Sequence, residues 1–405
     1  MRLLHTADWH LGQTLHGVSR EFEHARFLDW LEVQLAERAV DLLVIAGDVF
    51  DGQNPPVSAQ RLLFGFLARA RRRRPELAVV MIAGNHDRGG RLEAPSPLLE
   101  ELGVRVVGAL PRQPDGSLDI ERVLLPLVGG GWCAAVPYLR PGDLPAEEGD
   151  EPEIAGVRAV YQEIFAAARA RRQPGEVLIA LGHCYMAGGA LSELSERKIL
   201  RGNLHALPAE LFPAEVDYVA LGHLHRAQSI GGRESVRYSG SPLPLALDEA
   251  GYRHQVVLAD FHDGRFTGLE ILPVPRFVDI LRLTAAAPEA VPELLATLPE
   301  AAGERETWPL LELTVRLEQP APGLRALVET ALAGKGVRLA RLGLETTGHG
   351  RALGETALPL SALDPEEVFR RCWARRHAAE PAPAALAAFH DLLEAVHQGE
   401  GEGGP

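Results

Sequence analysis

Aspartate, asparagine and histidine recur in five short clusters along the chain, and each cluster follows an apolar run. The clusters are Asp8-Trp9-His10, Gly47-Asp48-Val49-Phe50-Asp51, Gly84-Asn85-His86-Asp87, Gly182-His183 and Gly222-His223-Leu224-His225. A mixture of carboxylate, amide and imidazole donors suits Mn²⁺, Fe²⁺ or Zn²⁺ better than Ca²⁺ or Mg²⁺, which favour oxygen ligands alone. The pattern therefore predicts a metal centre.

The size of this donor set indicates two metal ions. The expected ligands are Asp8, His10, Asp48, Asn85, His183, His223 and His225. They are too many for one ion with an open position, whereas two ions bridged by one carboxylate use all of them. Such a pair clamps the attacking and leaving oxygens of an in-line phosphoryl displacement and activates water as the nucleophile. The expected chemistry is therefore hydrolysis of a phosphate ester.

His86 lies next to an expected ligand without being needed as one. We expect it to give a proton to the leaving oxygen, with Asp87 or Asp51 orienting its ring. A single histidine is more often a structural or surface residue than a ligand, but five clusters in the same context make a chance arrangement improbable. The predicted catalytic residues are His86, Asp87 and Asp51.

Parallel strands are expected to position these side chains. Residues 42–46 read Leu-Leu-Val-Ile-Ala, an apolar run typical of a strand buried on both faces. The run stops at Gly47, which permits a sharp turn, and Asp48 follows at the carboxyl end of the strand, where ligands bind in open α/β sheets. The runs 2–6, 78–83, 177–181 and 216–221 lead into the other clusters in the same way. We expect these five strand ends to converge on one rim of an α/β domain.

The chain changes character near Pro273-Val274-Pro275, where we place a domain boundary. Before it, residues 21–38 are a predicted amphipathic helix, and residues 236–243, 254–261 and 269–274 are predicted strands of a second sheet. After it, strand and helix alternate over 277–283, 289–298, 310–317, 324–333 and 337–345, which predicts a small α+β domain. The expected divisions are 1–275, 276–350, a helix pair over 360–398 and a disordered tail over 399–405.

Length and composition agree with this organisation. A chain of 405 residues is long enough for two or three domains, and 46% apolar with 24% charged residues is typical of a globular protein. The sequence contains neither a signal-peptide pattern nor a run of about 18 apolar residues, so we expect a cytoplasmic protein without a membrane partner. Cys133, Cys184 and Cys372 lie far apart, which favours neither a disulfide framework nor a structural zinc site.

The formal net charge of −14 argues against nucleic-acid binding over the whole surface, but it leaves room for a local basic groove or a contact through metal ions. Basic runs occur at 69–74, 169–172 and 370–376. Two of them end predicted helices, where arginine complements the helix dipole without any ligand. The structural explanation of these runs is therefore favoured over a binding role.

The five clusters resemble the signature blocks of the calcineurin-like metallophosphoesterases, and they occur in that family's order. The resemblance implies a two-sheet β-sandwich flanked by helices, an α/β fold with a metal centre at one edge. The segments His5–Gly12, Ala46–Asp51 and Tyr238–Pro242 are similar to one bacterial branch of the family, the SbcD nucleases. This likeness is strong over about residues 1–275, and weaker in motif over the two C-terminal parts.

Membership of this branch would imply an exonuclease and endonuclease that uses Mn²⁺ at double-strand DNA ends and hairpins, in DNA repair, recombination and replication at the nucleoid. By the family pattern, Asp8, His10, Asp48 and His225 would hold one ion, and Asp48, Asn85, His183 and His223 the other. Such proteins form homodimers and assemble with SbcC, an SMC-like ATPase, into a heterotetramer. The α+β segment would be a capping domain that positions DNA.

The resemblance also gives the C-terminal helix pair a role in docking on the ATPase. Its apolar stripes include Phe369, Trp373, Leu386, Phe389 and Leu393, and packing onto the rest of the chain is an equally good explanation of them. One departure concerns Asp51, because archaeal and eukaryotic double-strand-break nuclease relatives carry histidine there, whereas general phosphoesterases carry aspartate. Whether Asp51 acts in protonation or in orientation is left open by the sequence.

Two other functions are compatible with parts of the pattern. A phosphodiesterase or phosphatase of the same fold could act on a small molecule, since a metal centre alone does not choose its substrate. The segments after residue 275 argue against it, because a small substrate needs neither a cap nor a docking tail. A tethering subunit with a vestigial centre is the second alternative, and the complete ligand set with His86 argues against that.

Overall fold

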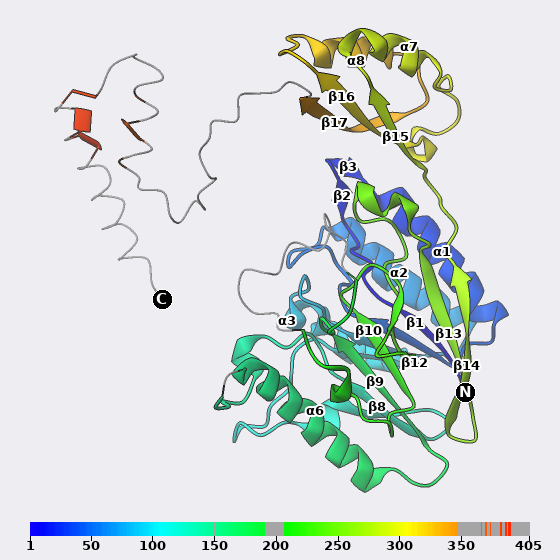
Figure 1. Ribbon diagram of the computed structural model, residues 1–405. Coiled ribbons are helices and arrows are strands. Elements are labelled where there is room, and N and C mark those ends of the chain that lie inside the picture. Colours follow the sequence, from blue (N-terminus) through cyan, green and yellow to red (C-terminus); the bar gives the residue numbers. More distant parts are fainter. Residues whose placement is uncertain are drawn as a thin grey trace. The chain divides into compact units, whose positions relative to one another are not determined.

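The computed structural model describes residues 1–149, 151–190 and 206–346, together with isolated positions between 366 and 389. The chain forms two compact units, Met1–Thr346 and Thr347–Pro405, and each is described by itself. The first unit contains two six-stranded sheets and one three-stranded sheet (Figure 1).

The first six-stranded sheet has the strand order β14-β13-β1-β4-β5-β6. Its strands are β1 (Arg2–Thr6), β4 (Leu42–Ala46), β5 (Ala78–Ile82), β6 (Val104–Val107), β13 (Gln255–His262) and β14 (Arg265–Pro273). Strands β1, β4, β5 and β6 are parallel, and β13 pairs antiparallel with β1. All five residues of β4 are buried, as the uninterrupted apolar run predicts.

The second six-stranded sheet has the order β11-β12-β10-β9-β8-β7. Its strands are β7 (Leu124–Pro126), β8 (Gly131–Ala135), β9 (Val177–His183), β10 (Tyr218–Gly222), β11 (Gln228–Ile230) and β12 (Arg233–Tyr238). Strands β8, β9, β10 and β12 are parallel, so both sheets present several carboxyl ends at one edge.

Alternating side chains of the strands fill two separate layers of core. Leu42 and Val44 belong to the cluster between the two sheets, whereas Leu43 and Ile45 belong to the cluster under the helices. Helices α1 (Glu21–Glu37) and α2 (Val57–Arg73) contribute to that second cluster, and α6 (Pro152–Arg171) covers the other side of the second sheet (Figure 1). The expected sandwich of two sheets flanked by helices is confirmed.

One expectation about the strands is wrong. The predicted strands at 254–261 and 269–274 exist as β13 and β14, but they extend the first sheet next to β1. Only the predicted strand at 236–243 lies in the second sheet, as the end of β12. The error has a physical reason, since the apolar pattern of a strand fixes which face is buried but not which neighbouring strand receives its hydrogen bonds.

The three-stranded sheet is built from the predicted alternation after residue 276. Strands β15 (Ile280–Ala285), β16 (Leu310–Leu317) and β17 (Arg338–Thr346) are parallel, and α7 (Val291–Ala296) and α8 (Leu324–Ala331) share a separate apolar core with them. Shorter elements of the first unit are β2 (Thr14–Leu15), β3 (Val18–Ser19), α3 (Gly89–Glu93), α4 (Ser96–Glu101) and α5 (Ile120–Val123). None of the described helices is long and apolar enough to cross a membrane.

In the second unit, three aromatic side chains of the predicted helix pair lie together. The rings of Phe369 and Phe389 are stacked with centroids 4.3 Å apart, and Trp373 lies 5.7 Å from Phe369. Leu386 is a described residue, whereas Leu393 and the predicted tail 399–405 lie outside the described residues.

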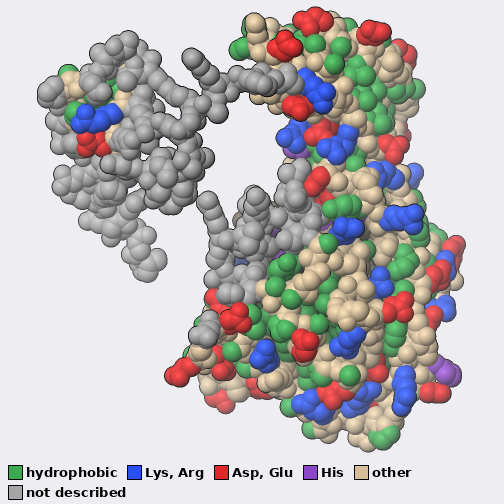
Figure 2. Space-filling view, viewed as in Figure 1, with side chains coloured by type: hydrophobic (Ala, Val, Ile, Leu, Met, Phe, Trp, Pro, Cys, Tyr) green, Lys and Arg blue, Asp and Glu red, His purple; other side chains and the backbone are tan. Residues whose placement is uncertain are grey.

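Charges of both signs are interspersed on the face of the described residues that Figure 2 shows. Two of the basic runs carry ion pairs at helix ends. Arg69 lies 3.0 Å from Asp29, and Arg172 lies 2.7 Å from Asp217. Side chains from these two runs therefore form ion pairs within the fold.

Candidate metal centre

The carboxyl ends of β1, β4 and β5 in one sheet and of β9 and β10 in the other carry all seven expected ligands to one place. Asp8, His10, Asp48, His183, His223 and His225 are buried, and Asn85 is half-buried. Because the two sheets face each other, side chains far apart in sequence become neighbours at this edge.

Asp48 lies between histidines of the two sheets. Its Oδ2 atom is 3.4 Å from His10 Nε2 and also 3.4 Å from His183 Nε2. Its Oδ1 atom accepts a hydrogen bond of 2.9 Å from the backbone N–H of His86. One carboxylate oxygen is thus equally close to imidazoles from both sides, which is the position a bridging ligand would need.

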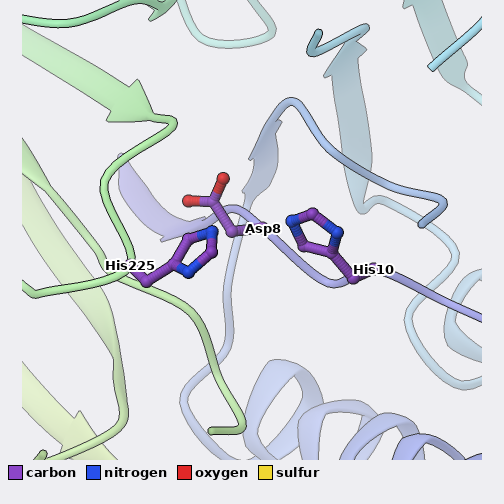
Figure 3. A group of neighbouring side chains, drawn as sticks. All are labelled: Asp8, His10 and His225. Carbon is purple, nitrogen blue, oxygen red and sulfur yellow. The ribbon is translucent and has the colours of Figure 1, made fainter. Parts of the chain in front are cut away.

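Asp8, His10 and His225 form one group of potential ligands, with ligand atoms all within 4.8 Å of one another. Figure 3 shows Asp8 between the two imidazole rings, which come from different segments of the chain. The carboxylate of Asp8 also accepts the backbone N–H of His223 at 3.0 and 3.2 Å. That contact ties the first sheet's ligand to the loop after β10.

Asn85, His183 and His223 form the other group. Asn85 Oδ1 lies 3.0 Å from His183 Nε2 and 3.0 Å from His223 Nδ1. The Nδ1–H of His183 donates to the carbonyl of Ala46 at 2.9 Å, so its Nε2 atom is the one that faces the site. Three ligand atoms from three different segments of the chain therefore converge.

His86 is held by Asp51, one of the two residues expected to orient it, but through the main chain. Its Nδ1–H donates to the backbone carbonyl of Asp51 at 2.9 Å, and its ring centroid lies 4.7 Å from that of His10. The Asp51 carboxylate instead contacts His10 Nδ1 at 3.1 Å. Asp51 thus serves two neighbours, His86 through its main chain and His10 through its side chain.

Of the two residues expected to orient His86, Asp51 contacts its ring through the main chain, and the carboxylate of Asp87 is engaged elsewhere. This buried carboxylate accepts backbone N–H groups of Val49, Phe50 and Gly84 at 3.1, 3.0 and 2.9 Å. A buried carboxylate needs such donors, and these come from the two loops that carry Asp48 and Asn85. In the structure Asp87 clamps those two loops together.

Close approach explains the glycines in these clusters. A Cβ atom on Gly47 would lie 2.2 Å from His183 Nδ1, and one on Gly84 would lie 2.1 Å from Asp48 Oδ1. Only glycine leaves room for the ligands at these points. The loops are also strained, since Asp8, His10 and Asp48 have φ of 55°, 45° and 47°. Such backbone is unfavourable for these residue types and is held by the surrounding structure.

Burial and mutual charge shift the pKa values of the centre. Burial opposes protonation of His10, but hydrogen bonds to Asp48 and Asp51 prevail and raise the pKa of His10 to about 10. Burial likewise opposes protonation of His183, and the charge of Asp48 raises its pKa to about 9. Burial, followed by the neighbouring His183, lowers the pKa of His223 to about 3. Without metal, two protonated imidazoles therefore flank the anionic Asp48.

The donor atoms fit divalent cations. The Nε2 atom of His223 is buried and has no hydrogen-bond partner among the described residues. A buried lone pair without a partner is unfavourable, and a cation in front of it removes that penalty. The surrounding donors are the carboxylate, amide and imidazole groups that bind divalent transition metals and zinc. These residues form a site for divalent metal ions.

One contact of the centre comes from a residue that the sequence did not single out. Glu249 Oε1 lies 3.0 Å from Nδ1 of His225. Glu249 is not next to any of the five clusters, and an acidic residue in the sequence Leu247-Asp248-Glu249-Ala250 carries no visible signal of this contact.

Comparison with known protein families agrees with this geometry. The profile of the calcineurin-like phosphoesterases matches residues 1–227, which include all five clusters. The profile of the type 5 capsule protein repressor C-terminal domain matches residues 276–377.

Several curated proteins are similar over much of the chain. The SbcD component of nuclease SbcCD from Rhodobacter capsulatus is 45% identical over 91% of this chain and 93% of that protein. The proteins of the same name from Escherichia coli and Bacillus subtilis are 38% and 40% identical, and the matches cover 68% and 65% of this chain and 68% and 67% of those proteins.

Proposed function

The chain belongs to the SbcD nucleases of the calcineurin-like phosphoesterase family and is a metal-dependent phosphodiesterase, and from this premise we propose that it uses two Mn²⁺ ions to cleave DNA at double-strand ends and hairpins. The names of the similar proteins support the nuclease activity. The donor set is compatible with Mn²⁺, because mixed oxygen and nitrogen ligands suit Mn²⁺, Fe²⁺ and Zn²⁺.

The observation that carries the proposal is the position of Asp48. Its Oδ2 atom lies 3.4 Å from one histidine of each sheet, His10 and His183. In the proposed centre Asp48 is the shared ligand of both ions. Asp8, His10 and His225 complete the shell of one ion, and Asn85, His183 and His223 that of the other.

The two ions, when bound, supply Lewis-acid activation of the phosphodiester and of the attacking water. His86 then has the geometry of a proton donor. Its Nδ1–H is fixed by the carbonyl of Asp51, so its Nε2 is the nitrogen available to a leaving oxygen. Asp51 positions His10, and Asp87 holds the two ligand loops in register. In this proposal only His86 touches the reacting atoms.

The proposed partners follow from the names of the similar proteins. The name SbcCD implies an SbcC-type partner, which in our proposal is an SMC-like ATPase that docks on the helix pair 360–398. In the proposal, the aromatic cluster of Phe369, Trp373 and Phe389 is the apolar element that contacts the ATPase. In the proposed heterotetramer at the nucleoid, two copies of the chain pair, and residues 276–350 cap the DNA.

The test is hydrolysis by the full-length chain in Mn²⁺, comparing linear duplex DNA, a DNA hairpin and a small aryl phosphodiester. The controls are Asp48→Ala, which removes the shared ligand, and His86→Gln, which removes the proton donor. We expect shortening of the duplex and opening of the hairpin, both abolished by chelation and strongly reduced in the two variants.

Two results would overturn parts of the proposal. Cleavage of the small ester with no action on either DNA, even with an SbcC-type ATPase present, would assign the centre to small-molecule phosphodiesters. Equal DNA cleavage by wild type and Asp48→Ala would remove Asp48 from the metal centre.

A further inference from the structure

Glu249 is a fully buried carboxylate beside the metal centre. It lies in η3 (Leu247–Gly251), a short 3-10 helix after the second sheet. Its Oε1 atom accepts a hydrogen bond of 3.0 Å from Nδ1–H of His225, and its Oε2 atom accepts one of 2.7 Å from the backbone N–H of Leu245. Burying a carboxylate is unfavourable unless donors surround it, and here each oxygen has at least one donor among the described residues.

The backbone that presents Glu249 is itself held in place. Gln13 Nε2 donates to the carbonyl of Leu245 at 2.9 Å, and Arg20 Nη1 donates to the carbonyl of Pro244 at 2.6 Å. Arg20 is only 1% exposed, so this anchor is shielded from water. The carboxylate therefore reaches His225 from a fixed position.

The main chain of His225 is fixed on its other side. Its carbonyl accepts the N–H of Ser241 at 3.0 Å. Gly240 has φ of 76°, and a Cβ there would lie 2.7 Å from the same carbonyl, so this turn packs directly on His225. With the backbone held by Ser241, the direction of the ring nitrogens of His225 is set by the rotation and tautomer of its ring.

We propose that Glu249 is a positioning residue of the metal centre, which fixes the Nδ1–H tautomer of His225 and thereby directs its Nε2 atom to a metal ion. The inference rests on the proposed assignment of His225 as a ligand. A carboxylate that receives the second N–H of a metal-bound histidine fixes its orientation and raises its basicity, and losing such a partner weakens metal binding about 10- to 100-fold.

The carboxylate is required because it accepts two hydrogen bonds at once. In Glu249→Gln the single amide oxygen can serve either His225 or the N–H of Leu245, and the amide NH₂ must face the other donor. If the amide oxygen faces His225, the NH₂ group opposes the N–H of Leu245. If the oxygen faces Leu245, the NH₂ group forces the proton of His225 onto Nε2, where it blocks metal binding.

The test measures Mn²⁺ binding to the full-length, metal-free chain by electron paramagnetic resonance of free Mn²⁺ and by titration calorimetry. Glu312→Gln is the matched control, because Glu312 is also buried and paired, with Arg282 at 2.6 Å and Arg341 at 3.1 Å, but it belongs to the three-stranded sheet. We expect two ions for the wild type and the control. In Glu249→Gln we expect one ion to bind about 10- to 100-fold more weakly and the other to be unchanged.

Folding is controlled by urea unfolding of the metal-free proteins. If Glu249→Gln unfolds at low urea, Glu249→Asp replaces it, since this variant keeps the charge but withdraws it from His225 by one methylene. The same selective weakening of one ion is expected for it. If the folded variant binds both ions as tightly as the wild type does, the proposal is overturned.

His225→Ala separates this inference from the function on which it rests. If His225→Ala loses one ion and the folded Glu249 variant does not, Glu249 is not a positioning residue although the ligand assignment holds. If His225→Ala itself keeps both ions, the ligand assignment fails, and the role of Glu249 fails with it.

Discussion

The two halves of the metal centre orient their histidines by different means. The carboxylate half comprises Asp8, His10 and His225, and the carbonyl half comprises Asn85, His183 and His223. In the carboxylate half, Asp51 lies 3.1 Å from Nδ1 of His10, and Glu249 lies 3.0 Å from Nδ1 of His225. Both proposed ligands are therefore held by ionisable side chains.

In the carbonyl half, the corresponding partner of His183 is the main chain, whereas Nδ1 of His223 lies 3.0 Å from the side-chain oxygen of Asn85. His183 Nδ1–H donates to the carbonyl of Ala46, the last residue of β4, at 2.9 Å. A carbonyl at a strand end cannot be removed by substitution, and it adds no formal charge. Its position is fixed by the hydrogen bonds of the sheet.

This difference predicts which half is more sensitive to mutation. Carboxylate partners raise the basicity of the imidazoles that they contact, and single substitutions can remove them. The carbonyl partner can be displaced only by distorting the sheet. We therefore expect substitutions of the orienting side chains to change the affinity for the ion in the carboxylate half. The affinity for the ion in the carbonyl half should depend on its direct ligands.

Replacing the ligand that the two halves share should have the largest effect. Asp48→Asn removes the charge of the oxygen that lies 3.4 Å from both His10 and His183. We expect DNA cleavage to fall by about 10³-fold or more, equivalent to about 4 kcal/mol in the activation free energy. Calorimetry with Mn²⁺ should show both ions weakened. Loss of only one ion would show that Asp48 belongs to one half and does not bridge them.

His86→Gln should affect the chemical step and leave both halves intact. His86 lies close enough to His10 and Asp48 to be grouped with them as a potential ligand. In our proposal it donates a proton, so the variant should cleave about 10²- to 10³-fold more slowly at saturating Mn²⁺ while still binding two ions. Single-turnover cleavage and Mn²⁺ titration measure the two quantities. A missing ion in His86→Gln would move His86 into the ligand shell.

The sequence located the donors because residue type and strand end coincide at each cluster. It could not identify the partners that orient them. The role of the Ala46 carbonyl cannot be recognised from the residue type, since every residue has a backbone carbonyl. Glu249 contacts His225 only because the chain passes through β12 and η3 first, and spacing along the sequence does not encode that path.

The fold shows the same division between local and non-local information. The run at 42–46 predicted a strand buried on both faces, and β4 is one. The strands at 254–261 and 269–274 were predicted in the right places but in the wrong sheet, because β13 pairs with β1 from the opposite end of the domain sequence, with Arg2 opposite Asp260. Local pattern specifies a strand, whereas its partner depends on the packing of the whole domain.

Metal binding should release protons, chiefly from the histidines next to Asp48. In the metal-free chain the pKa of His10 is raised to about 10 and that of His183 to about 9, so both are protonated at neutral pH. Because a metal binds the unprotonated ring, each of these protons must leave, and binding must strengthen as pH rises. With about two protons released, the overall binding constant for two ions should rise by about 10²-fold per pH unit between about pH 6 and pH 8.

Calorimetry in two buffers of different ionisation enthalpy measures this proton release directly. His223 serves as an internal contrast, since burial and the neighbouring His183 lower its pKa to about 3 and it has no proton to lose at neutral pH. Proton release close to zero would mean that His10 and His183, whose pKa values are raised, do not exchange a proton for a metal ion.

The smallest effect is expected from Asp51→Asn, and it tests whether the two carboxylates of the carboxylate half are equivalent. Asp51 and Glu249 contact their histidines at nearly the same distance, 3.1 and 3.0 Å, but the Asp51 side chain is 41% exposed and that of Glu249 is 0% exposed. Water can replace the hydrogen bond of an exposed group and screens its charge, so Asp51→Asn should weaken one ion by less than about 10-fold.

At the site that includes His10 and His225, the expected Mn²⁺ affinity is therefore highest in the wild type, lower in Asp51→Asn and lowest in Glu249→Gln. Raising the ionic strength should narrow the difference in Mn²⁺ affinity between wild type and Asp51→Asn, because added salt screens the exposed charge of Asp51. The difference in affinity between wild type and Glu249→Gln should stay unchanged, because the charge of Glu249 is buried. Equal losses in the two variants at low and high salt would show that distance alone, and not burial, sets the contribution of a carboxylate that orients a metal ligand.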